Sequence, residues 1–388
     1  MVAPLFLENP QLSSLLTLVN SATISERADV VLVDPDGHQI IRRQVTLGPH
    51  SQAEVSVREL LEDAKSTATM GSVEVNAADQ NMAIAAQLSI SGQSPARTVH
   101  FEEELIMPMI QGSKVSRAAV VSVVGLPIIA LRSLNNAGQK VAINCLDEQH
   151  GMIESVVDVP PGALVLWRGC VTNGAVTPPL FNVLQSDHSM GRRSIGLSVA
   201  TSGEAGGLTV FGVAMRSHDP DGAVYTPINF SDPAQARSST TVFTGVPVGP
   251  TDPMLGASFQ PELAATNFGD TPATATVRYS FTRLGQVQTQ AVAHLVVPQL
   301  STRTISLPEL QADPGLQNSF VVESSAGPGE LYASMRSVSS STPWVSDVLG
   351  QDARQLHNGG LHPWNIADST ASTLLLFNHT KLLKHSTF

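Results

Sequence analysis

The sequence predicts an all-β protein built of antiparallel β-sandwiches. Val, Thr, Ser and Ala dominate it, and 29 Gly and 25 Pro punctuate it, a composition typical of many short strands. Residues 259–285 show the pattern most clearly: a strand ending at Asn267, a Gly-Asp turn, then a strand with apolar side chains at the alternate positions Val277, Tyr279 and Phe281. The same pattern recurs elsewhere in the chain.

Length and charge limit the organisation and the partners. A chain of 388 residues with 42% hydrophobic and 14% charged residues can form two to four folded domains. The net charge of −11 and the absence of a basic run argue against nucleic acid as a partner, because phosphate binding needs clustered Lys and Arg.

The most apolar segment, residues 118–131, is too short for a membrane-spanning helix and contains a Gly-Leu-Pro sequence. It predicts two strands joined by a turn, so no membrane span is expected. The N-terminus shows no signal peptide. Cys145 and Cys170 are either two buried thiols or a disulfide between neighbouring strands, and the sequence leaves both possibilities open.

The first unit can be followed element by element. One strand runs to Asn20, and residues 28–33 lead into the Asp34-Pro35-Asp36-Gly37 turn. A return strand reaches residue 47, Ser56 and Glu59 form a capping box that predicts a short helical turn, and residues 71–75 and 83–88 form a closing hairpin.

These landmarks recur after about 250 residues. Asn20 corresponds to Asn267, the Pro49 turn to that at Pro298, and Ser56/Glu59 to Ser306/Glu309. The middle third fits more loosely: Asn135-Asn136 stands for the strand end, Pro160-Pro161 replaces the single Pro, and residues 173–191 form an insertion.

The chain therefore divides into repeated units. We expect sandwiches at residues 1–105, 106–245 (diverged) and 246–362, and a segment, 363–388, that begins a further unit or completes a neighbouring one. The last segment is assigned because Leu374-Leu375-Leu376-Phe377-Asn378 repeats the apolar strand before Asn20. This recurrence favours a fragment of a longer array.

Residues 263–277, with an Asn-x-Gly turn at Asn267-Phe268-Gly269, resemble the tandem immunoglobulin-like, adhesion-related modules of bacterial surface and secreted proteins. The resemblance implies immunoglobulin-like sandwiches that act as spacers, ligand-presenting scaffolds or adhesion elements. It transfers no functional residue.

Two acidic features have structural interpretations. Asp34-Pro35-Asp36-Gly37 recurs as Asp219-Pro220-Asp221-Gly222, which favours turns over calcium loops because the further oxygen ligands are missing. The run Glu102-Glu103-Glu104 is interpreted as a solvated connector.

One segment concentrates the residues of a candidate binding surface. His357 and His362 lie near Trp344 and Trp364, and exposed Trp side chains often stack on sugars or anchor partners. The alternatives are an ordinary linker and packing against the next module. The spacing of the histidines does not predict a metal site.

No nucleophile elbow, phosphate-binding loop or dinucleotide-binding motif occurs in the sequence. We therefore expect a non-catalytic extracellular or cell-envelope scaffold, without cofactor, whose partners are other protein modules or cell-surface polymers. The alternatives are a carbohydrate-binding module that uses Trp344, Trp364 or Trp167 and an accessory region of a larger secreted hydrolase.

Overall fold

The computed structural model is nearly all β-structure, in antiparallel sheets, as the sequence predicts. It describes residues 1–354 apart from 11, 78–82, 94–101, 110–117, 125, 135–137, 148–150, 169, 171–193, 202–206, 219–221, 229, 253–256, 284–285, 308–317, 340–344 and 349. Within that part of the chain, no helix is long and apolar enough to cross a membrane.

Six sheets form three pairs, which follow one another along the chain. In the first pair, sheet 1a has the strand order β1-β6-β3-β4 and sheet 1b the order β5-β2-β7-β8. The bounds are β1 Val2–Leu7, β2 Leu12–Asn20, β3 Glu26–Val33, β4 Gln39–Leu47, β5 Gln52–Ser56, α1 Val57–Asp63, β6 Met70–Ala77, β7 Ile84–Gln93 and β8 Glu102–Met109.

The second pair consists of sheet 2a, with the order β12-β11-β14-β9, and sheet 2b, with the order β13-β10-β15-β16. Its strands are β9 Ala118–Val124, β10 Leu126–Ser133, β11 Gln139–Asp147, β12 Gly151–Val159, β13 Leu164–Arg168, β14 Ser194–Thr201, β15 Leu208–His218 and β16 Gly222–Ile228.

The third pair consists of sheet 3a, β21-β20-β23-β17-β26, and sheet 3b, β18-β19-β24-β25, in which β22 also pairs with β19. Its elements are the 3₁₀ turn η2 Pro233–Gln235 and the strands β17 Thr240–Thr244, β18 Gly249–Asp252, β19 Ala257–Asn267, β20 Ala273–Arg283, β21 Gln286–Val297, β22 Ser301–Ser306, β23 Asn318–Ser324, β24 Leu331–Ser339, β25 Val345–Val348 and β26 Gln351–Asp352.

The three pairs share one strand order. The order β1-β6-β3-β4 corresponds to β9-β14-β11-β12 and to β17-β23-β20-β21, and β5-β2-β7-β8 corresponds to β13-β10-β15-β16 and to β22-β19-β24-β25. The ladders give the residue equivalences: Asn20, Ser133 and Asn267 each close the ladder of the second strand with the seventh. The expected boundary after residue 105 falls inside β8, and β17, which precedes the boundary at 245, pairs with β23.

Period-two alternation builds each core. In β20 the side chains of Val277 and Tyr279 are fully buried while Thr274 and Arg278 are exposed, because successive side chains of a strand point to opposite faces. Three buried clusters, one centred on each pair, result from this pattern.

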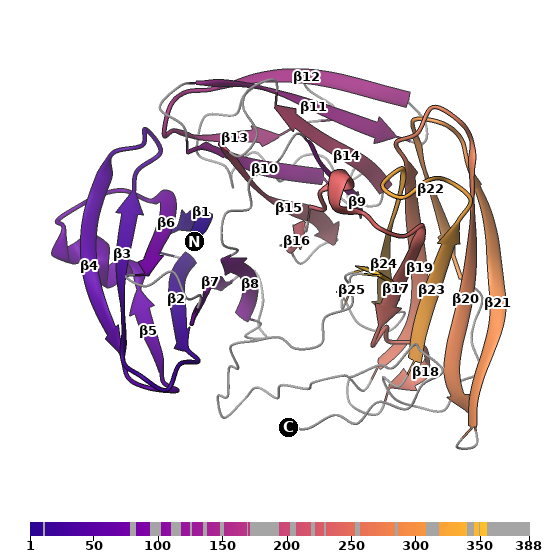
Figure 1. Ribbon diagram of the computed structural model, residues 1–388, viewed down its shortest axis with the longest axis horizontal. Helices are drawn as coiled ribbons and strands as arrows, with labels where there is room; N and C mark the ends of the chain where they lie inside the picture. The colour runs from indigo at the N-terminus through magenta and orange to yellow at the C-terminus, as the bar shows by residue number, and fades with distance from the viewer. Residues whose placement is uncertain are drawn as a thin grey trace.

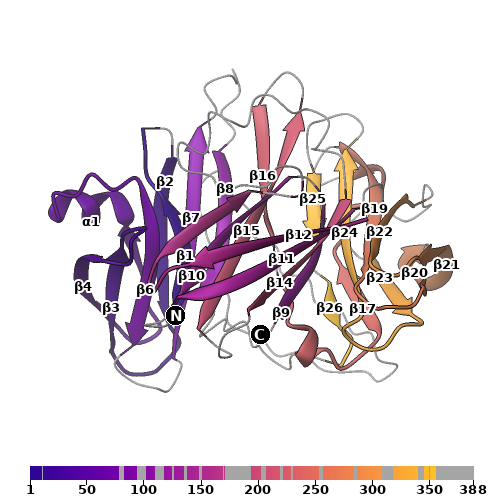
Figure 2. The ribbon, with the colours of Figure 1, turned by 90° about the horizontal axis from the view of Figure 1, so that it is seen from above.

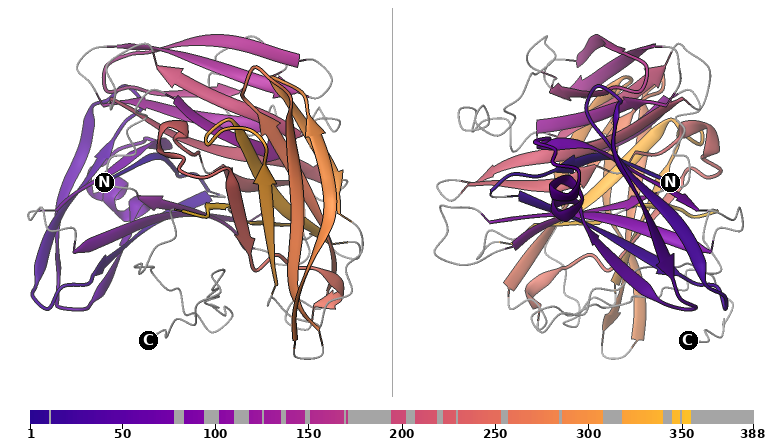
Figure 3. Two further views of the ribbon diagram at one scale, coloured as in Figure 1. Left: turned by 45° about the vertical axis from the view of Figure 1, so that its right-hand side comes forward. Right: turned by 90° about the vertical axis from the view of Figure 1, so that its left-hand side faces the viewer.

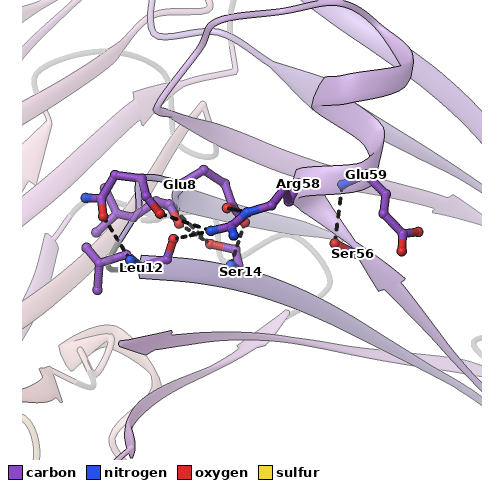
Figure 4. Close-up of polar contacts among 8 residues, drawn as sticks. Glu8, Leu12, Ser14, Ser56, Arg58 and Glu59 are labelled. Carbon is purple, nitrogen blue, oxygen red and sulfur yellow. Dashed lines mark hydrogen bonds and ion pairs between the residues drawn. The ribbon is translucent and has the colours of Figure 1, made fainter. Parts of the chain in front are cut away.

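A short helix, α1, closes an end of the first pair, where the capping box predicts a helical turn. The Ser56 hydroxyl accepts a hydrogen bond from the Glu59 backbone N–H (3.3 Å), and Val57, Leu60 and Leu61 of α1 are buried. In the same helix, the Arg58 guanidinium pairs with the buried Glu8 carboxylate (3.1 Å), as Figure 4 shows. These contacts fix the chain where β1 passes into β2.

The three pairs form an arch, with the second pair between the first and the third (Figure 1). Seen from above, the pairs follow one another in chain order from one end of the molecule to the other (Figure 2), and the turned view in Figure 3 shows the same arch. Among the residues that the structure describes, the pairs are therefore joined at two places, between the first and second pairs and between the second and third.

Candidate functional site: the two junctions between sheet pairs

The binding surface expected from the sequence lies outside the described residues. This applies to Trp344, Trp364, His357 and His362, so their joint role stays a prediction. Trp167, in contrast, is described: it lies on β13 and is only 2% exposed. A side chain buried in the core cannot stack on a sugar from solvent, so Trp167 is not a carbohydrate-binding residue.

The Asp34-Pro35-Asp36-Gly37 sequence forms the β3–β4 turn. Both carboxylate oxygens of Asp34 contact His38: one accepts its backbone N–H (2.8 Å), and the other lies 3.3 Å from its ring Nδ1. Asp34, Asp36 and His38 could bring three metal-ligand atoms within 4.8 Å of one another. Three ligands on a turn are well short of the six to eight oxygens that calcium takes, so a turn remains the better interpretation.

This turn also belongs to the first junction. The Leu164 backbone N–H donates to the Pro35 carbonyl (2.8 Å), which ties β13 of sheet 2b to the turn of sheet 1a. A Cβ on Gly37 would lie 2.8 Å from the backbone of Gly162, and Gly37 has φ +92°. Glycine is thus required here both by the backbone conformation and by the close approach of a second chain segment.

Apolar side chains make most of the first junction. Ile128 and Ala130 on β10, and Leu164 and Leu166 on β13, belong to the buried cluster of the first pair and not to that of their own pair. They are on the outer face of sheet 2b, because their neighbours Ile129 and Leu131 point into the core of the second pair. The outer face of sheet 1a is buried correspondingly at Val31, Val33 and Ser72.

A partly buried ion pair accompanies this apolar contact. The Arg132 guanidinium on β10 donates to Glu74 on β6 (2.5 Å), and the Arg132 side chain is 5% exposed. Its Nε and Nη1 are buried without a hydrogen-bond partner. Removing Glu74 alone would leave a buried uncompensated cation, which makes the pair sensitive to single substitution.

Small hydroxyl side chains form the second junction. Thr266 on β19 donates to Ser122 on β9 (3.1 Å) and lies 2.9 Å from the hydroxyl of Thr302. Thr302 on β22 in turn donates to the Leu146 carbonyl on β11 (2.8 Å). Because all three side chains are at most 3% exposed, the outer faces of sheets 2a and 3b are joined by two buried hydrogen bonds, one from Thr266 to Ser122 and one from Thr302 to the Leu146 carbonyl.

The β14 backbone lies close to the Thr266 side chain at this point. A Cβ on Gly196 of β14 would lie 2.1 Å from Thr266 Cγ2, so only glycine leaves room for the threonine. Gly196 and Thr266 thus form a matched pair, one on each side of the junction.

A disulfide cross-links the second sheet pair, which lies between the two junctions. Cys145 on β11 is bonded to Cys170, which follows β13, with the two Cα atoms 5.6 Å apart. This settles the alternative that the sequence left open. The bond links sheet 2a to sheet 2b, and each of these sheets takes part in one junction.

Burial raises the pKa of Tyr279 and of Tyr332 above the usual range, because a desolvated phenolate is disfavoured. Both phenols therefore stay neutral near pH 7. Tyr279 packs on Phe320, with ring centroids 4.6 Å apart, so its ring contributes to the packing of the core.

Comparison with models of known protein families, with curated proteins and with solved structures gives no match. Among the described residues, the two junctions are therefore the candidate functional surfaces.

Proposed function

We propose that this chain is a non-catalytic scaffold or spacer, built of three tandem immunoglobulin-like sandwich modules of the bacterial surface or secreted type. The observation that carries the proposal is the pair of buried junctions. Modules joined only by linkers move independently, whereas modules joined by buried apolar and hydrogen-bonded surfaces hold a set geometry. The function would be to keep binding elements at a fixed distance and angle.

Two features support immunoglobulin-like modules. The same strand order occurs in all three sheet pairs, as expected of a repeated unit. In the second pair, Trp167 and the inter-sheet disulfide lie in one buried cluster, and antibody domains likewise pack a core Trp against an inter-sheet disulfide.

The disulfide also supports a location outside the cytoplasm, in the extracellular space or the cell envelope. Disulfides form and persist in oxidising compartments and are rare in reducing ones. We propose other protein modules or cell-surface polymers as partners. Carbohydrate binding remains the alternative, and it depends on Trp344 and Trp364.

Distance measurements between spin labels test the fixed geometry. Labels on Glu62→Cys and Asp158→Cys, both exposed, span the first junction, and labels on Asp158→Cys and Thr289→Cys span the second. Electron-spin distance measurements should give one narrow distribution for each pair, as narrow as that for two labels within one module.

A pair within the third module, Thr274→Cys and Thr289→Cys, supplies that reference because both positions are on sheet 3a and exposed. Broad distributions across both junctions, beside a narrow reference, would contradict a scaffold that sets distance. Glycan binding that is lost on changing Trp344 or Trp364 would favour the alternative.

A further inference from the structure

The two junctions have the same arrangement of sheets. Sheet 2b of the second pair covers the outer face of sheet 1a, and sheet 3b of the third pair covers the outer face of sheet 2a. The six sheets therefore stack in the order 1b, 1a, 2b, 2a, 3b, 3a. Among the described residues, the outer faces of 1b and 3a are the two that no other sheet covers.

The outer face of sheet 1b has the residue types of a junction. On β2 it presents Leu15, Thr17 and Val19, which are partly exposed. The ladders place Thr17 at the position of Ala130 and Ala264, and Val19 at that of Arg132 and Thr266, each of these counterparts being at most 4% exposed within a junction. On the neighbouring strand β7 this face adds Ala85, Gln87 and Ser89, and on the edge strand β5 it adds one charged residue, Glu54, opposite Thr17.

The outer face of sheet 3a corresponds to the outer faces of sheets 1a and 2a, each of which is covered by a sheet of the next pair. Ser280 and Ser319 pair across β20 and β23, as Val33 pairs with Ser72 in sheet 1a and Leu146 with Gly196 in sheet 2a. Those four counterparts are all buried, whereas Ser280 and Ser319 are partly exposed.

The charges of this face are balanced, so it carries no net negative charge that would repel the Glu54 carboxylate of the docking sheet. Arg278 and Glu323 form an ion pair on it (3.0 Å), with side chains 50% and 45% exposed. The rest of the face is largely small and hydroxyl-bearing, at Thr274, Thr276 and Ser280, the chemistry by which sheets 2a and 3b already join.

We propose that the outer face of sheet 1b docks on the outer face of sheet 3a of a second copy of this chain. The contact would continue the stacking order from one molecule to the next. It uses two different faces, so it is head-to-tail and can extend into a chain of copies or close into a ring. The inference extends the proposed scaffold function but uses a different contact, so either can fail alone.

Sedimentation velocity over a range of concentrations tests the association. The purified chain should sediment faster as its concentration rises towards about 1 mM, passing beyond dimer, whereas a chain that stays monomeric over this range overturns the proposal. The spin-label distances within one molecule are unaffected by this outcome, so the scaffold function is judged separately.

Two single variants identify the faces. Val19→Lys places a charge on the 1b face, and Ser319→Lys places one on the 3a face. Each variant alone should stay monomeric, because every contact would bury an unpaired lysine. Mixed in equal amounts, they should form a dimer and nothing larger, since one pair of unaltered faces remains.

Val156→Lys is the matched control. Val156 is a valine on the edge strand β12 with 62% exposure, outside both faces, so this variant should associate as the parent chain does. Association of either face variant by itself would indicate a symmetric contact or another surface and would overturn the head-to-tail assignment. Circular dichroism confirms that each variant is folded.

Discussion

A buried asparagine makes equivalent hydrogen bonds at two places that are 247 residues apart in the sequence. The Asn20 side-chain amide donates to the carbonyls of Ile24 (2.8 Å) and Gly48 (2.8 Å), and its oxygen accepts the Ala22 N–H (2.9 Å). The Asn267 amide donates to the carbonyls of Thr271 (2.7 Å) and Val297 (3.2 Å), and its oxygen accepts the Gly269 N–H. Each asparagine ties the end of a strand to two turns.

Replacing Asn20 by alanine should therefore cost more than a surface substitution. Asn20→Ala leaves buried backbone groups without partners, and we expect the free energy of unfolding of the first sheet pair to fall by about 2 kcal/mol. Urea denaturation followed by circular dichroism measures the change. Asn76→Ala, on an exposed position of β6, should change it by less than about 0.5 kcal/mol; equal effects of the two variants would contradict the assigned role.

At the scale of single residues, the sequence revealed equivalent positions only where the units share the same residue type. Asn20 and Asn267 align as one of several landmarks at a nearly constant offset, and the ladders place both at the same position. In the middle unit the sequence favoured Asn135 and Asn136, which lie outside the described residues, whereas the ladder position is held by Ser133. A serine at a strand end has no distinctive pattern, so the equivalence could not be read without the strand pairing.

At the scale of elements, one turn recurs before β5, β13 and β22. It holds a residue in the left-handed region each time: His50 (φ +47°), Gly162 (φ +67°) and Leu300 (φ +47°). A side chain in this region costs about 1 kcal/mol, and glycine avoids that cost. Only the middle unit has glycine at this position.

Leu300→Gly should consequently be nearly neutral. Glycine removes the strain of the left-handed conformation, but it loses about 1 kcal/mol more chain entropy on folding. Because the two effects offset each other, the free energy of unfolding should change by less than about 0.5 kcal/mol. Gln299→Gly, one residue earlier, gains no such relief and should lower it by about 1 kcal/mol. Thermal denaturation of both variants tests the difference, and equal losses would show that the turn is not strained at Leu300.

The disulfide should stabilise the second pair against unfolding. Cys145 and Cys170 are 25 residues apart in sequence, and closing a loop of that length restricts the unfolded chain by about 3 kcal/mol. In the variant with both cysteines changed to serine, the free energy of unfolding should fall by about this amount, and amide exchange in β11 and β13 should be faster. A reducing agent should lower the stability of the parent chain and leave that of the variant unchanged; an unchanged parent would contradict the contribution.

Strands with alternating or continuous apolar residues were predicted well, including two strands within residues 118–131, although Leu126 and Pro127, expected in the turn between them, belong to β10. Strands without that pattern were not. Glu102, Glu103 and Glu104, interpreted as a connector, begin β8 and pair with β7. An edge strand is stabilised by backbone hydrogen bonds to its neighbour, and these bonds do not require a periodic pattern of side chains.

At the scale of the whole molecule, the arch follows from the junctions, and no sequence pattern pointed to them. Ile128 and Ala130 look like core residues of their own sandwich, although they contact the preceding one. Gly196 and Thr266 are 70 positions apart in the sequence and of common types. Contacts between outer faces combine residues from separate units, so they depend on how the units stack, which local sequence does not encode.

Gly196→Val should open the second junction while leaving the sandwiches folded. Even the first carbon of the new side chain would lie 2.1 Å from Thr266 Cγ2, too close for either strand to keep its place. Since the added carbons point out of the second core, circular dichroism should be unchanged. Small-angle X-ray scattering should show a larger radius of gyration and a broader distance distribution.

Ser198→Val provides the matched control, because it adds a valine on the same face of the same strand, two residues along, where Ser198 is half-buried. It should leave the scattering unchanged. The milder Gly196→Ala should be rescued by Thr266→Gly, which removes the methyl and hydroxyl groups that the new Cβ meets, although each change alone weakens the junction. If Gly196→Val scattered as the parent chain does, the arch would be held by contacts other than the Gly196–Thr266 pair.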